Sequence, residues 1–151
     1  MRTLGNILWH VPFLGFITAS LFWLTGGLFT ITVIGAPIGL GLMEYGKFLF
    51  WPFGKEMVSK KDLNIEQNSA WATYALIVRI LYFPIGLIYA IIAIFQIIGL
   101  FITILGIPMA IIVAKSISTV FNPVNKKCVS SAVADELDRR RGIQELEAIQ
   151  K

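Results

Sequence analysis

The segment TVIGAPIGLGLMEYGKFLFWPFGKEMV (Thr32–Val58) decides the fold class, because it is nearly as apolar as a membrane span and yet carries charges. Pro37 stands near its start, and Glu44 and Lys47 lie within it. A second segment, TILGIPMAIIVAKSISTVFNPVNKKCV (Thr103–Val129), has the same pattern 71 positions later (32 + 71 = 103). Both segments read Gly-x-Pro, an apolar run, and Phe-x-Pro-x-x-Lys. This doubled pattern predicts two copies of one structural unit.

The register of the two copies rests on residue types that apolar runs do not share by chance. Two prolines, a glycine and a lysine recur at the same offset, together with apolar and small residues on both sides. The identical pairs include Gly15/Gly86, Ala19/Ala90, Ile31/Ile102, Thr32/Thr103, Gly35/Gly106, Pro37/Pro108, Phe50/Phe121, Pro52/Pro123, Lys55/Lys126, Val58/Val129 and Ser59/Ser130.

The composition indicates a membrane protein. Apolar residues make up 56% of the 151 residues and charged residues only 15%, whereas a soluble domain has about 25% charged residues. Residues 3–43 and 80–114 contain no Lys, Arg, Asp or Glu. Uncharged apolar stretches longer than about 18 residues are typical of transmembrane helices. We therefore predict an all-α integral membrane protein.

Each apolar run covers about 50 residues, which is enough for two spans of about 20 residues. The sequence predicts four transmembrane helices, arranged as two parallel repeats of a kinked helical hairpin. We place the spans at 4–25, 28–52, 74–96 and 99–122.

Glycines suggest where the chain turns between the spans. Turns are expected at Gly26-Gly27 and at Gly99. The Gly-x-Pro motifs then fall inside helices, where proline removes a backbone donor and produces a kink. The kink residues are Gly35, Pro37, Gly106 and Pro108. The alternative puts the turn at Gly-x-Pro itself, followed by a shorter helix.

Four segments follow from this pattern. The first repeat is 1–58, a linker is 59–73, the second repeat is 74–129, and a cytoplasmic amphipathic helix is 130–151. Lysines and arginines gather in the linker and the C-terminal segment, and the proposed turns carry none. The positive-inside rule places both termini and the linker in the cytoplasm. The repeats are then parallel, with a pseudo-twofold axis along the membrane normal.

Several segments of this sequence resemble a known family. MRTLGNILW at the start, the paired GAPIG and GIPMA, and the paired WPFGKEMV and NPVNKKCV are similar to the YccF family over residues 1–130. The second copy departs from the first in having Asn122 and Asn125 where the first has Trp51 and Gly54. The resemblance implies a small bacterial inner-membrane protein built from a duplicated inner membrane component domain. It implies no catalytic residue and no substrate.

Charged side chains inside predicted spans each need a physical reason. Glu44 and Lys115 occupy the same position in the two copies (44 + 71 = 115). They are expected at one membrane depth and, having opposite charges, to pair either within the chain or with a neighbouring subunit. Such residues serve either as an ion pair that fixes packing or as the lining or gate of a pore. Lys47 and Arg79 are close enough to span ends to reach the membrane surface.

Aromatic and imidazole side chains complete the candidate set. Trp51 and Trp71 fall near the cytoplasmic span ends, where interfacial anchors are expected. His10 lies in the first span, as a packing partner through hydrogen bonds or as a pH-sensitive group.

The sequence offers little chemistry for an enzyme. It has no nucleophile–base pair, no phosphate-binding loop and no metal cluster, since His10 is the sole histidine and Cys128 the sole cysteine. We expect no catalytic residue, no metal and no cofactor. Acids are interleaved with the C-terminal arginines, which argues against nucleic acid. The expected partners are the lipid bilayer, further copies of the chain, and ions.

Two function classes remain. One is an oligomeric inner-membrane channel or a transport protein for ions or small solutes, with a pore between subunits. The other is a structural or regulatory membrane protein that assembles with a partner or modulates it.

Overall fold

The computed structural model describes residues 2–11, 14–66 and 68–150. Residues 12–13, inside the predicted 4–25 span, and residue 67, inside the predicted linker, lie outside the described residues, as do the end residues 1 and 151. The elements in order are α1 (Arg2–His10), α2 (Gly15–Ile31), α3 (Ala36–Phe50), β1 (Lys55–Ser59), α4 (Ser69–Ile102), the 3₁₀ helix η1 (Ile104–Gly106), α5 (Ile107–Phe121), β2 (Lys126–Ser130) and α6 (Ser131–Ile149).

The turn between α2 and α3 lies at the Gly-x-Pro motif, so the prediction of a turn at Gly26-Gly27 is wrong. Helix α2 runs through both glycines to Ile31. Gly26 instead allows close packing, since a Cβ there would lie 2.7 Å from the Gly39 carbonyl oxygen of α3. Val33, with φ of 57°, reverses the chain direction.

The prolines begin helices instead of kinking them, which corrects the predicted role of Gly35, Pro37, Gly106 and Pro108. Pro37 lies in the first turn of α3 and Pro108 in the first turn of α5. Proline suits this position because its missing N–H has no intrahelical partner there, and its φ is already helical. Gly35 and Gly106 are the residues before these helices.

The predicted span bounds change accordingly. The predicted 28–52 span becomes the end of α2, a turn and the 15-residue α3. Helix α4 passes through Gly99 to Ile102, so no turn occurs at Gly99, and the chain turns at residues 103–106. The predicted 4–25 span is divided between α1 and α2, which meet at about 80°.

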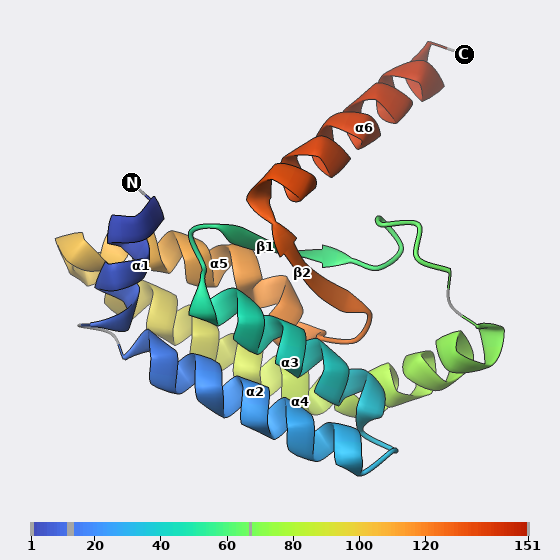
Figure 1. Ribbon diagram of the computed structural model, residues 1–151, viewed down its shortest axis with the longest axis horizontal. Coiled ribbons are helices and arrows are strands. Elements are labelled where there is room, and N and C mark those ends of the chain that lie inside the picture. Colours follow the sequence, from blue (N-terminus) through green and yellow to red (C-terminus); the bar gives the residue numbers. More distant parts are fainter. Residues whose placement is uncertain (1, 12–13, 67, 151) are drawn as a thin grey trace.

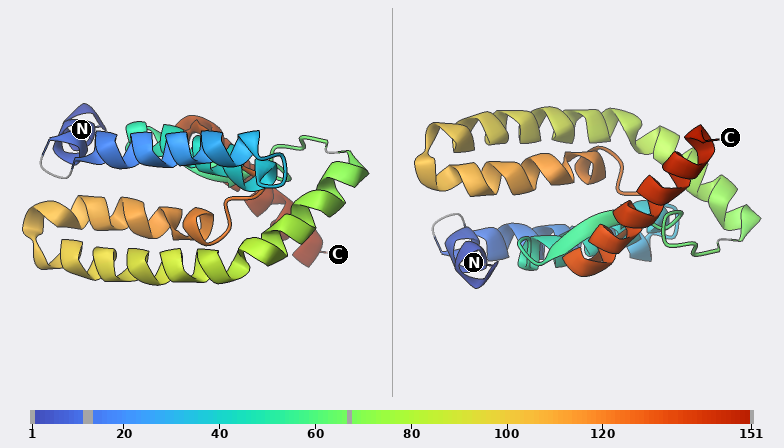
Figure 2. Two further views of the ribbon diagram at one scale, coloured as in Figure 1. Left: turned by 90° about the horizontal axis from the view of Figure 1, so that it is seen from below. Right: turned by 90° about the horizontal axis from the view of Figure 1, so that it is seen from above.

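Helix α4 is the longest element, with 34 residues, or about 51 Å at 1.5 Å per residue. The Asn68 side chain caps its start by accepting from the Ala70 N–H. Pro84 stands inside the helix. Because proline clashes with the preceding turn, a bend is expected there, and the N-terminal part of α4 is indeed inclined to the rest (Figure 2).

A two-stranded antiparallel ribbon was not predicted. Strands β1 and β2 pair with Lys55 opposite Ser130 and Ser59 opposite Lys126, so that Met57 lies opposite Cys128. The ribbon joins the ends of the two predicted repeats, 71 residues apart, and the Lys60 N–H donates to the Asn125 carbonyl just beyond it. Sequence reasoning had assigned these residues to the end of each repeat without a partner.

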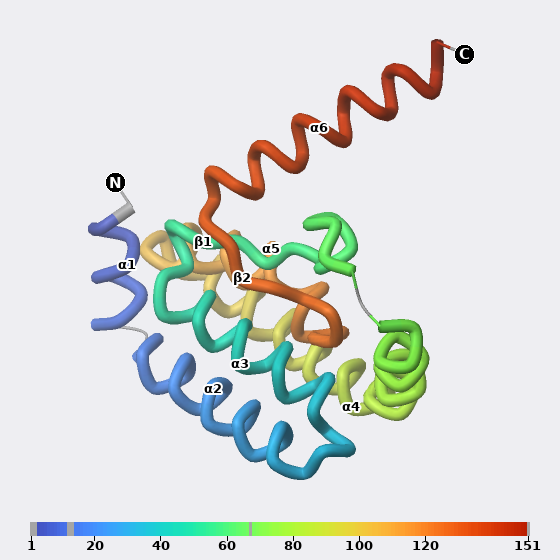
Figure 3. The backbone as a smooth tube through the Cα atoms, turned by 45° about the vertical axis from the view of Figure 1, so that its right-hand side comes forward, coloured from blue at the N-terminus to red at the C-terminus, as the bar shows by residue number. Residues whose placement is uncertain are grey.

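The helices form two antiparallel pairs, α2 with α3 and α4 with α5 (Figure 1). The ribbon lies over α3 and α5, α2 and α4 lie on the side away from it, and α6 extends away from the helices (Figure 3). Side chains from α1, α2, α3, α4 and α5 make the main core, whose buried members are Trp9, Ala19, Tyr45, Phe48, Leu49, Ala93, Met109, Ile112, Val113 and Val120.

Candidate functional site

The candidate site is the layer where the ribbon rests on α3 and α5, because the charged residues inside the apolar segments have their partners there. Glu44, in the middle of α3, has a half-buried carboxylate. Its Oε1 accepts from Lys47 Nζ at 2.6 Å, and its Oε2 accepts from the Cys128 backbone N–H at 3.0 Å. Glu44 therefore satisfies an outward-facing N–H of β2, as well as a neighbouring lysine.

Lys115, at the corresponding place in α5, has a different partner. Its Nζ donates to Glu56 Oε1 of β1 at 3.2 Å. Among the described residues, Glu44 and Lys115 thus pair with Lys47 and Glu56 respectively, and no contact joins the two. The predicted ion pair between them within the chain is replaced by contacts from each helix to the ribbon.

The charges of the two copies are exchanged. Positions 44 and 127 carry Glu and Lys, and the positions 71 residues away, 115 and 56, carry Lys and Glu. Glu44 and Lys127 line one recess of about 120 Å³, and Lys115 and Glu56 line another of about 500 Å³. Lys115 of α5 therefore meets an opposite charge, Glu56, on β1, whereas Glu44 of α3 pairs with Lys47 of its own helix and reaches β2 through the Cys128 N–H.

A buried hydrogen bond joins α3 and α5 directly. Tyr45 Oη and Ser116 Oγ are 3.1 Å apart, and Ser116 also donates to the Val113 carbonyl at 2.9 Å. Tyr45 and Ser116 are 71 residues apart, like Glu44 and Lys115. Sequence reasoning missed this contact, although the 71-residue offset marks both residues as polar members of one position.

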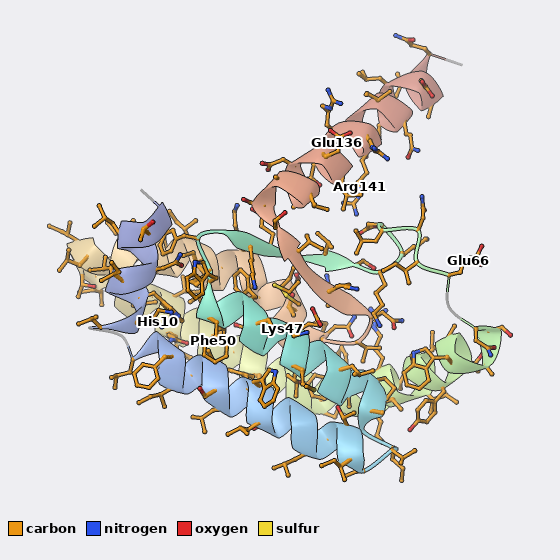
Figure 4. All side chains as sticks on the ribbon, in the orientation of Figure 1. His10, Lys47, Phe50, Glu66, Glu136 and Arg141 are labelled. Atoms are coloured by element: carbon orange, nitrogen blue, oxygen red, sulfur yellow. The ribbon has the colours of Figure 1, made fainter. Side chains whose placement is uncertain are left out.

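His10 caps the C-terminal end of α3. Its Nε2 lies 3.0 Å from the Phe50 carbonyl oxygen, and the neighbouring Trp9 Nε1 donates to the Leu49 carbonyl at 2.9 Å (Figure 4). The last carbonyls of a helix lack intrahelical donors, so these contacts stabilise the end of α3. The structure thus gives His10 a packing contact, and its pH sensitivity stays a prediction.

The residues predicted to anchor the chain at the membrane surface lie in different elements and have different contacts. Trp51 is 59% exposed after the end of α3. Trp71, near the start of α4, packs against Tyr74 with ring centroids 5.9 Å apart. Lys47 pairs with Glu44. Arg79 lines a recess of about 450 Å³ beside α4, together with Lys61 and Lys126.

Two ionisable groups of β2 are perturbed by their position on the helices. Burial lowers the pKa of Lys126; Asp62 opposes this, while Arg141 and Arg79 lower the pKa further. Burial also raises the pKa of the Cys128 thiol to about 11; Lys55 and Lys47 oppose that shift, and Glu44 adds to it. The thiol is therefore protonated at neutral pH.

We expect Cys128 to react slowly with iodoacetamide in the folded protein. At pH 8, a thiol with a pKa raised by about two units holds about 100-fold less thiolate than an unshifted one, and the thiolate is the reacting form. The rate at pH 8 is measured for protein in mild detergent and for the same protein unfolded in dodecyl sulfate. Equal rates in the two states would show that the thiol is neither buried nor shifted.

The described residues contain no group of three or more His, Cys, Asp or Glu side chains placed to hold a metal ion. Glu44 and Lys115 of the ribbon layer are instead engaged with Lys47, the Cys128 N–H and Glu56. The layer therefore offers electrostatic and packing contacts.

The helices match a membrane environment by length and composition. Two stretches, Ser69–Ile102 and Ile104–Phe121, are long and apolar enough to cross a membrane, and the bent pair Thr3–His10 and Gly15–Ile31 is a third if it counts as one span. The fold is thus that of a predominantly helical membrane protein. Residues 4–55 match the YccF family, described as an inner membrane component domain.

This match covers 52 of the 151 residues, and it supports the resemblance and a membrane location for the chain. No curated protein matches the chain, and no solved structure matches it either.

Proposed function

We propose that this chain is a structural or regulatory protein of the bacterial inner membrane, without catalytic chemistry, which assembles with a protein partner or with further copies of itself. The observation that carries the proposal is the internal neutralisation of Glu44 and Lys115. Each of the two charges has an oppositely charged partner within the chain at 2.6–3.2 Å, which supports a structural role for them. The contacts with a partner or with further copies are then expected on a surface that the chain's own residues do not cover.

Helix α6 offers such an uncovered surface, because it extends away from the other helices. Arg141 pairs with Asp62 and the Ser131 N–H donates to the Gly54 carbonyl, which hold the start and middle of the helix on the ribbon and its following loop. Beyond Arg141, which Figure 4 labels, the helix continues away from the other helices. Ile143, Leu146 and Ile149 are 49%, 61% and 81% exposed and are spaced three residues apart. Such a stripe is suited to packing against another helix.

We also propose that the chain contains two copies of one structural unit. The equal spacing of elements supports it: α3 and α5 begin at 36 and 107 and end at 50 and 121, each 71 apart, and β1 and β2 begin at 55 and 126, again 71 apart. Two copies that share one ribbon form a single body, which suits a scaffold for assembly.

The experiment compares the size of the complex in native nanodiscs excised from membranes. We expect wild-type particles to contain more protein than one chain, and the Ile143→Gln/Leu146→Gln double variant to shift to the single-chain mass. Glu145→Gln, on the same helix turn, is the matched control and keeps the wild-type mass. Single-chain wild-type particles would contradict the assembly.

The channel is the competing function, and the same preparation tests it. Liposomes that contain wild-type protein are expected to show no more ion flux than protein-free liposomes. Flux above that level, changed by Glu44→Gln and unchanged by Lys61→Gln, would replace our proposal with an oligomeric pore near Glu44.

A further inference from the structure

The two helix pairs run in opposite directions along the long axis of the molecule. In Figure 2 the colours of α2 proceed from its start at one end to its finish at the other, and those of α4 proceed the opposite way. The same holds for α3 and α5. The turn at residues 32–35 and the turn at residues 103–106 therefore lie at opposite ends of the molecule.

An approximate twofold axis relates the two halves, and two contacts place it. Residues related by a twofold axis touch each other only near that axis. Tyr45 touches Ser116 at 3.1 Å, and Met57 lies opposite Cys128 in the ribbon, and both pairs are 71 residues apart. The axis thus passes through the centre of the ribbon and between α3 and α5. It crosses the helices instead of running along them.

Charge and apolar surface are separated along this axis. On the side away from the ribbon, α2 has no charged residue and α4 has none after Arg79. Large side chains there are exposed to an extent uncommon in a soluble protein, for example Leu28 at 67%, Leu81 at 70% and Phe95 at 71%. Toward the ribbon lie the cations that line the 450 Å³ recess, Lys61, Arg79 and Lys126.

An upright orientation, with the helices along the membrane normal, conflicts with the ribbon. The ribbon contacts the middle of α3 through Glu44 and the middle of α5 through Lys115. It would lie at the depth of the hydrocarbon, with open backbone groups at the strand edges in lipid, where no water is present to satisfy them. Lys55, Lys126 and Lys127 would be there too, where charged side chains are costly.

We propose that the protein lies in one leaflet of the bilayer, with its twofold axis along the membrane normal and with α2 and α4 embedded roughly parallel to the membrane plane. The partner of the α2/α4 surface is the acyl-chain region of a phospholipid leaflet. The ribbon and α6 then face the cytoplasm, and the Lys61/Arg79/Lys126 recess lies at the level of the headgroup phosphates. This orientation rests on the membrane location alone and does not require the assembly through α6.

The lengths of the elements agree with this orientation. Helix α3 has 15 residues, or about 22 Å, which is shorter than the hydrocarbon thickness of about 30 Å. Helix α4, at about 51 Å, is much longer than that thickness. Lying in the plane imposes no such length on a helix.

The first test measures which side of the membrane each turn reaches. Ile34→Cys and Leu105→Cys report the two turns in a Cys128→Ala background, with Glu145→Cys, outside the apolar stripe of α6, as the cytoplasmic control. Cys128→Ser serves as the background if Cys128→Ala does not yield folded protein. Intact spheroplasts and inverted vesicles are treated with a membrane-impermeant maleimide, and labelling after dodecyl sulfate treatment shows that each thiol is present.

The single-leaflet orientation predicts that neither turn is labelled from outside in spheroplasts, and that Glu145→Cys is labelled in inverted vesicles. External labelling of both turns would overturn the proposal in favour of four parallel spans. External labelling of one turn would overturn it in favour of helices that cross the bilayer in opposite directions.

The second test measures depth and gives a positive signal. Bimane attached at Leu24→Cys, in the middle of α2, is compared with bimane at Ile34→Cys in liposomes that contain lipids with a doxyl quencher at a shallow or a deep carbon. An embedded in-plane helix predicts the same quenching profile at both positions. Stronger deep quenching at position 24 than at position 34 would show that α2 crosses the bilayer and would refute the proposal. Neither result depends on whether α6 binds a partner.

Discussion

Gly41→Ala is expected to lower the free energy of unfolding by about 1–3 kcal/mol, because α3 has no room for a methyl group at this position. A Cβ on Gly41 would overlap the backbone carbonyl of Pro123, in the segment that leads from α5 into β2. Backbone atoms cannot move aside as a flexible side chain can. The change therefore separates α3 from the other half of the chain, at the place where the two halves meet.

The measurement is thermal unfolding in mild detergent, followed by the reaction of Cys128 with a fluorogenic maleimide. The half-buried thiol becomes accessible when the ribbon leaves the helices, which makes the sole cysteine an internal reporter. Gly27→Ala is the matched control, since a Cβ there meets no atom within 4 Å. It removes a glycine from the middle of α2 and should add about 0.5–1 kcal/mol of stability. Equal midpoints for the two variants would contradict the close approach at Gly41.

Trp9→Ala is expected to cost about 3–5 kcal/mol, the usual range for removing a large buried aromatic side chain. Trp9 is 3% exposed, contributes to the main core, and its ring fills the space beside Gly15 at the start of α2. It also donates from Nε1 to the Leu49 carbonyl at 2.9 Å. One side chain thus holds α1, α2 and the end of α3 together.

Trp9→Phe separates the hydrogen bond from the packing. Phenylalanine keeps most of the ring contact and leaves the Leu49 carbonyl without its donor, which should cost about 1–3 kcal/mol. Trp51→Phe is the control, because Trp51 is exposed, and its midpoint should stay within about 0.5 kcal/mol of wild type. If Trp9→Phe and Trp51→Phe unfold at the same temperature, the Trp9 hydrogen bond contributes nothing to stability.

Local sequence patterns predicted which segments are helical and left one choice open between two turn positions. Gly26-Gly27 and Gly-x-Pro are both ordinary signals for a chain reversal. In the structure the turn lies at Gly-x-Pro. Gly26 is needed where α2 approaches α3, because a Cβ added there would lie 2.7 Å from the Gly39 carbonyl oxygen. Proline then serves at the start of α3, where its lack of an N–H costs nothing. Sequence alone does not distinguish a glycine that is required for close helix packing from a glycine that is required for a turn.

The sequence predicted which charged residues belong to the candidate site, but it did not predict which groups they contact. Glu44 and Lys115 were singled out by charge and by their 71-residue offset, and both do lie in the layer between helices and ribbon. Their partners, the Cys128 N–H and Glu56, belong to strands whose pairing is itself a long-range event. Two five-residue segments separated by 66 residues carry no local signal that they will meet.

The sequence by itself determined the membrane character, the 71-residue repetition, the helical segments and the C-terminal helix, because each of these depends on hydrophobicity or on spacing along the chain. The tertiary structure alone decided the ribbon, the contacts of Glu44 and Lys115 with the strand of the other half, and the opposite directions of the helix pairs. These depend on which surfaces meet after the chain has turned. The Tyr45–Ser116 and Met57–Cys128 pairs are properties of that packing, and the orientation in the membrane that we propose rests on them.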